Sequence, residues 1–103
     1  MAGERPESSL PGEDMVQQGI ADLAQSRITD FSLLVLIAAR RLRDLGIEVP
    51  DRRLSDFPEH ALYERLEDRL GTAAHSYYNS LLRRVVSYAH ALDREKSQRD
   101  APR

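Results

Sequence analysis

Apolar residues are densest between Phe31 and Ala39, where Ser32 is the single polar residue. A helix that is apolar on every side is buried in the interior of a domain. The stretch continues into a more polar segment, which predicts one helix over about residues 30–45. Its apolar part rises only about 14 Å as a helix, whereas a bilayer requires about 20 residues. We therefore expect an all-α bundle of three to four helices around this central helix, and no contact with a membrane.

Both ends of the central helix carry local signals. Thr29 or Asp30 can cap the first turn by accepting hydrogen bonds from its free backbone N–H groups. Gly46 suits the left-handed position after the last turn, and Ile47 would then contact Leu42 as in a Schellman motif. These signals predict where the helix begins and ends.

A weaker helix is predicted before it, over residues 14–26. Its apolar stripe consists of Val16, Ile20 and Leu23. Gly19 costs this helix about 1 kcal/mol relative to alanine. We expect it to form only by packing on the central helix.

A third helix is predicted over residues 57–70. Asp56 and Glu59 have the Asp-x-x-Glu spacing of a capping box. The apolar stripe consists of Leu62, Leu66 and Leu70. Gly71 follows it and favours a helix end there.

The longest predicted helix covers residues 73–95, about 35 Å. Its first apolar stripe has the alternating steps of four and three of a coiled-coil seam: Ala74, Tyr78, Leu81, Val85, Tyr88 and Leu92. A second stripe lies beside it: Leu82, Val86 and Ala89. One neighbouring helix cannot cover both stripes. The second stripe therefore either completes the core or binds a second copy of the chain, and we expect it to meet the partner.

Length and composition suit one small domain. The 103 residues are 41% hydrophobic, and we expect a helical domain over residues 14–95 between flexible tails at 1–13 and 96–103. A domain of this size buries little more than about 60% of its unfolded surface, so association is a common remedy. The first residues do not resemble a signal peptide, and we expect a cytoplasmic protein.

Charge argues against a strongly basic nucleic-acid-binding protein, because the net charge is −2. Four arginines are nevertheless candidate phosphate contacts: Arg40, Arg41, Arg43 and Arg84. The first three also suit the negative end of the central helix, where positive charge is stabilising. A nucleic-acid-binding regulator is therefore our second functional interpretation.

The sequence offers no recognisable metal or cofactor site. It has no cysteine, and its histidines, His60, His75 and His90, lack the spacing of helical metal ligands. Phosphate-binding glycine loops and the GxSxG motif of hydrolases are also missing. We therefore expect neither a metal nor a cofactor.

The last helix carries the residues most typical of a binding surface. Tyrosine and arginine dominate interface hot spots, although an edge tyrosine also packs with its hydroxyl in water. The candidate surface comprises His75, Tyr77, Asn79, Leu82, Arg83, Val86, Ala89 and His90. Our first interpretation is a small non-enzymatic interaction or regulatory protein that forms a homodimer through this helix.

A third interpretation comes from Arg84 and His90, which form an Arg-x5-His pattern inside a helix. The pattern resembles that of the HEPN-type ribonucleases, small helical bundles that cleave RNA as dimers. The resemblance covers seven residues, and Val85 stands where the family usually has a polar residue. Helix geometry also turns the two side chains about 120° apart. An HEPN-like ribonuclease therefore ranks behind the other two interpretations.

Overall fold

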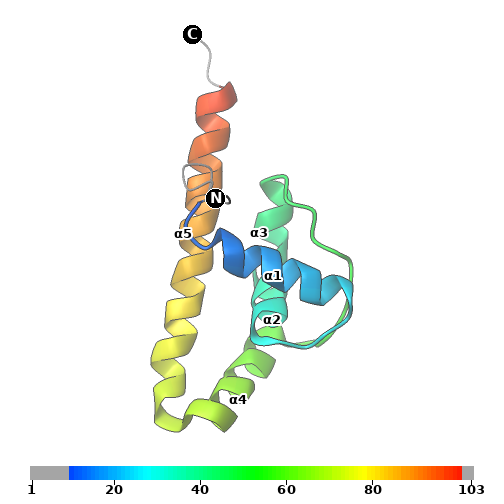
Figure 1. Ribbon diagram of the computed structural model, residues 1–103, viewed down its shortest axis with the longest axis vertical. Coiled ribbons are helices and arrows are strands. Elements are labelled where there is room, and N and C mark those ends of the chain that lie inside the picture. Colours follow the sequence, from blue (N-terminus) through cyan, green and yellow to red (C-terminus); the bar gives the residue numbers. More distant parts are fainter. Residues whose placement is uncertain (1–9, 101–103) are drawn as a thin grey trace, which may run out of the picture.

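The computed structural model describes the backbone of residues 10–100 and the side chains of residues 10–98. All regular structure in that range is helical, and it consists of α1 (Glu13–Ala24), α2 (Asp30–Ile37), α3 (Ala39–Asp44), α4 (Pro58–Leu70), the one-turn 3₁₀ helix η2 (Gly71–Ala73) and α5 (Ala74–Asp100). This confirms the all-α bundle with a long C-terminal helix. Figure 1 shows α5 along the full length of the molecule, with its C-terminal end extending beyond the other helices. No helix within the described range is long and apolar enough to span a membrane.

The core is centred on α2, as the sequence predicts. Leu33, Leu34 and Val35 are buried, because α1 crosses one side of α2 while α4 and α5 pack on the others (Figure 1). Leucines from every neighbouring helix complete the core: Leu23, Leu42, Leu62, Leu66 and Leu81. The predicted apolar stripe of α4 is buried only in part, since Leu70 at its end is exposed.

The predicted central helix is interrupted at Ala38. This residue leaves helical geometry with φ −98° and ψ 9°, and it separates α2 from α3. No proline, glycine or capping side chain lies nearby in the sequence, so local pattern gives no signal for the break. The interruption leaves Ile37 and Ala38 half-buried at the surface of the bundle.

The predicted caps of this region are confirmed. The Thr29 hydroxyl accepts a hydrogen bond from the Ser32 N–H, and the Ser32 hydroxyl accepts one from the Thr29 N–H. At the other end Gly46 adopts φ 94°. The Ile47 N–H then donates to the Leu42 carbonyl at 2.9 Å, which closes a Schellman motif.

The capping box predicted for α4 is wrong. Phe57 is the N-cap of α4, and no side chain caps it. Asp56 instead forms an exposed ion pair with Arg53. The sequence spacing was correct for a capping box, but the connector places the carboxylate beside an arginine.

The N-terminal boundary of the domain lies earlier than predicted. Leu10 packs against the core, and Gly12 approaches the Arg84 carbonyl of α5 so closely that a Cβ there would lie 2.8 Å from the oxygen. An isolated leucine among polar residues shows no periodicity, so sequence pattern placed it in the tail. At the other end α5 continues to Asp100, past the predicted end at residue 95. Residues 1–9 and 101–103 of the two predicted tails lie outside the described residues.

Candidate interaction surface

An apolar groove of about 340 Å³ lies between the α2–α3 junction and α5. The groove is lined by Ile37, Ala38, Arg41, Leu82, Val85, Val86, Ala89 and His90. Its α2–α3 side is formed by Ile37 and Ala38, two apolar residues that are half-buried where α2 ends. Its α5 side is the second apolar stripe predicted from the sequence.

The two apolar stripes of α5 have different environments. The first stripe faces the core: its members Ala74, Leu81, Val85 and Tyr88 are buried, and Tyr78 and Leu92 are half-buried. The second stripe is covered in part by α2 and α3. Leu82 is half-buried and Ala89 is buried, but Val86 is 50% exposed. Within one protomer the second stripe therefore belongs partly to the bundle and partly to its surface.

Charged and polar side chains border the groove toward the C-terminal end of α5. The Arg41 guanidinium lies 4.0 Å from the Asp93 carboxylate, and both side chains are more than half exposed. His90 lies beside them and is also exposed. The groove thus has an apolar floor and an edge that carries both signs of charge.

A polar cluster lies at the other end of α5, where α4 turns into it. The Tyr63 hydroxyl is 3.4 Å from His75 Nδ1, and the Asn79 amide nitrogen is 3.2 Å from His75 Nε2. The rings of Tyr63 and Tyr78 lie 5.2 Å apart, and burial, followed by the charge of Glu59, raises the pKa of Tyr78. The cluster joins α4 to the same helix that forms the groove.

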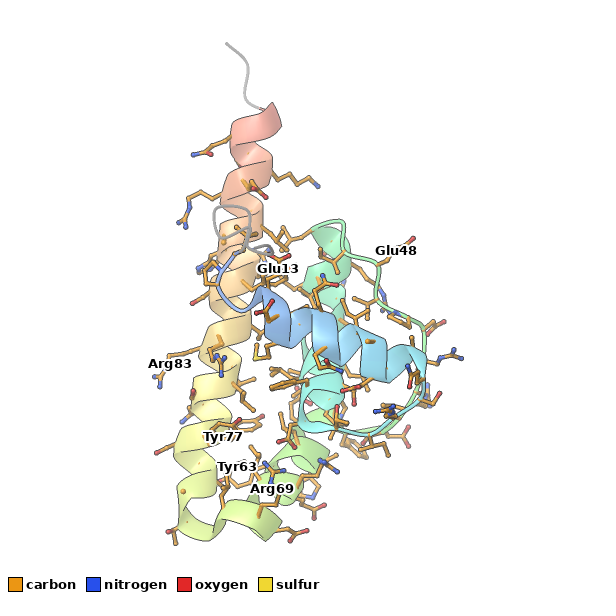
Figure 2. All side chains as sticks on the ribbon, in the orientation of Figure 1. Glu13, Glu48, Tyr63, Arg69, Tyr77 and Arg83 are labelled. Atoms are coloured by element: carbon orange, nitrogen blue, oxygen red, sulfur yellow. The ribbon has the colours of Figure 1, made fainter. Side chains whose placement is uncertain are left out.

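Six of the eight residues predicted for the surface lie at the groove or the polar cluster: His75, Asn79, Leu82, Val86, Ala89 and His90. The other two point elsewhere. Tyr77 packs against the core, and Arg83 points away from the bundle (Figure 2). Arg83 lines a separate polar hollow of about 300 Å³ with the Pro11–Gly12 segment.

The four candidate phosphate contacts do not form one site. Arg43 donates to the Val49 carbonyl at 3.0 Å and the Pro50 carbonyl at 3.2 Å, so it holds the connector after α3. Arg41 borders the apolar groove, and Arg84 lines the polar hollow beside Pro11. Arg40 is exposed on α3. An extended nucleic-acid surface would require these charges on one face.

The residues of the Arg-x5-His pattern also lie apart. Arg84 lines the polar hollow, whereas His90 lines the apolar groove. Within residues 10–98 no three histidine, aspartate or glutamate side chains gather as ligands of a metal would.

Sequence pattern missed three contributors to this surface. Ile37 and Ala38 were assigned to the core, because nothing in the sequence signals that they lie half-buried at the end of α2. Asp93 was not singled out, although it continues the second stripe of α5 by a further step of four from Ala89. No protein-family model matches the chain, and comparisons with curated proteins and with solved structures found no similar protein.

Proposed function

We propose that this protein is a small non-enzymatic interaction protein that self-associates through the groove between α2–α3 and α5. The observation that carries the proposal is Val86, an apolar side chain that lines the groove and is 50% exposed. Burying apolar surface contributes about 25 cal/mol per Å², and a small domain has few internal means of doing so. A second copy closes such a face symmetrically, which is the commonest arrangement among soluble oligomers.

Val86→Glu tests this proposal. In a single protomer the new carboxylate would reach water, so the fold should be retained, whereas in a dimer it would be buried without a partner. We expect the wild type to sediment as a dimer at micromolar concentration and Val86→Glu to sediment as a folded monomer, with an unchanged far-UV circular dichroism spectrum.

Ile28→Glu is the matched control. Ile28 is 52% exposed, nearly the same as Val86, but it lies in the loop between α1 and α2 and does not line the groove. It should leave the dimer intact. A wild type that remains monomeric would remove the basis for self-association. If Val86→Glu also unfolds the protein, both stripes belong to the core.

A further inference from the structure

One side of α5 carries a seam that is longer than its second apolar stripe. Alternating steps of four and three connect six residues: His75, Asn79, Leu82, Val86, Ala89 and Asp93. This is the spacing of a two-helix coiled-coil seam. The seam is apolar in its middle and polar at both ends, with a histidine at one end and a carboxylate at the other. These ends lie about 27 Å apart along the helix.

We propose that the occupant of this seam is a second copy of the chain, with the two α5 helices antiparallel and Asp93 of each copy facing the partner's His75. This inference rests on the proposed self-association and adds its orientation and register. The orientation and register are inferred from the complementary side chains at the two ends of the seam, a histidine at one end and a carboxylate at the other.

The antiparallel arrangement pairs the largest apolar residues of the seam with each other at its centre and the two polar ends with each other at the outside. In antiparallel coiled coils the two kinds of seam position face each other, because one helix runs back along the other. Val86 then packs against the partner's Leu82, and Asn79 lies opposite the partner's Ala89. Asp93 meets the partner's His75 in the outermost layers. The apolar pairs occupy the centre, where exclusion of water is greatest.

Other arrangements of the same seam are less favourable. Parallel helices would bring Asp93 against its own copy, and two carboxylates in one layer repel each other. An antiparallel pair shifted by one heptad in either direction places a polar side chain, Asp93 or Asn79, against Leu82. Burying a polar group there without a partner is costly.

Both polar ends are accessible in the protomer. Asp93 forms a 4.0 Å, half-exposed ion pair with Arg41, and such pairs contribute little. His75 is exposed although it contacts Tyr63 and Asn79. The C-terminal end of α5 extends beyond the bundle (Figure 1). In an antiparallel dimer this end lies along the partner where its α4 turns into α5.

Disulfide cross-linking tests the register, because the chain contains no cysteine. The double variant His75→Cys/Asp93→Cys should form covalent dimers under mild oxidation, because position 75 of each copy faces position 93 of the other across the seam. Within one chain the two positions are too far apart to join, because a disulfide requires Cα atoms within about 7 Å. Each single variant should remain uncross-linked, because its two copies lie at opposite ends of the dimer.

The outcomes separate this inference from the proposed function. Single variants that cross-link as readily as the double variant would show parallel helices and overturn the antiparallel register. A double variant that sediments as a dimer but forms no disulfide would also overturn the antiparallel register. The proposed self-association would then stand. A wild type that is monomeric in sedimentation would overturn both.

Discussion

At the scale of single residues, Gly19 shows how packing reverses a local preference. A Cβ at this position would contact the Phe31 carbonyl oxygen and lie 2.6 Å from Val35 Cγ2. The glycine therefore lets the backbones of α1 and α2 approach closely, although it weakens α1 as an isolated helix. The close approach explains why Met15, Val16 and Leu23 of a marginal helix are buried.

Gly19→Ala should destabilise the protein. Helix propensity alone would favour alanine by about 1 kcal/mol, but overpacking against backbone costs about 1–3 kcal/mol and should prevail. The urea midpoint should fall relative to the wild type. Ala21→Gly, at an exposed site of the same helix, measures how much the alanine–glycine difference in helix propensity is worth in α1. A higher midpoint for Gly19→Ala would mean that α1 and α2 are less closely packed.

Asp22 is a second residue of α1 whose environment helical spacing does not reveal. It is buried, because its carboxylate accepts hydrogen bonds from the Thr29 hydroxyl at 2.8 Å and the Gln18 amide at 3.0 Å. Thr29 is also the cap of α2. The buried carboxylate thus links the end of α1 to the start of α2.

At the scale of elements, an ion-pair clamp joins the start of α2 to α4. The Arg69 guanidinium donates to both oxygens of Asp30 at 2.8 and 3.1 Å, and Arg65 Nε donates at 3.1 Å. Burial raises the pKa of Asp30, but the hydrogen bonds and charges of the two arginines outweigh burial. The pKa therefore lies below its usual value of 3.8.

Asp30→Asn should lower stability in a pH-dependent manner. Because the folded pKa is lowered, the stabilisation is complete above the unfolded value and is lost as pH falls through the folded one. The arginines are half exposed, so we expect a loss of only about 1 kcal/mol at pH 7. Melting temperatures of the two proteins should differ by a constant amount above about pH 5 and converge below about pH 4.

Asp56→Asn is the control for the clamp, because Asp56 pairs with Arg53 where both side chains are mostly exposed. It should change the melting temperature little at any pH. A gap between wild type and Asp30→Asn that persists unchanged at pH 2 would show that the carboxylate acts through packing and not through its charge.

At the scale of the whole molecule, α5 serves two roles. Its first stripe closes the core, and its second stripe, which lies beside the first, forms one side of the groove. The molecule measures 50 × 29 × 26 Å, and the extended C-terminal end of α5 accounts for the long axis (Figure 1). The segment before α1 packs on the bundle, since Leu10 contacts the core and Gly12 approaches the middle of α5 at Arg84 and Tyr88.

Leu10→Asp tests whether this segment is part of the fold. Moving a half-buried leucine out of the core and placing a charge there should cost about 1–2 kcal/mol. The urea midpoint of unfolding should decrease accordingly. Ile28→Asp, at an exposed isoleucine, should leave the midpoint nearly unchanged. Equal effects of the two changes would mean that Leu10 contributes no packing.

The sequence alone determined the features that depend on neighbours along the chain. Helical spacing placed α1, α4 and α5, and the first stripe of α5 was correctly assigned to the core. The Thr29 cap and the Gly46 Schellman motif were predicted because both are made within a few residues. Within the candidate surface, the Leu82, Val86 and Ala89 stripe followed from the same spacing.

Only the tertiary structure decided the features that depend on residues distant in sequence. The interruption at Ala38 lies at the groove, and it has no local signal. The Asp30 clamp joins residues 39 positions apart, and the Tyr63–His75 contact requires the turn between α4 and α5. A carboxylate or a glycine has the same helical spacing whether water, an arginine or a backbone carbonyl lies opposite. That partner is set by how the helices pack.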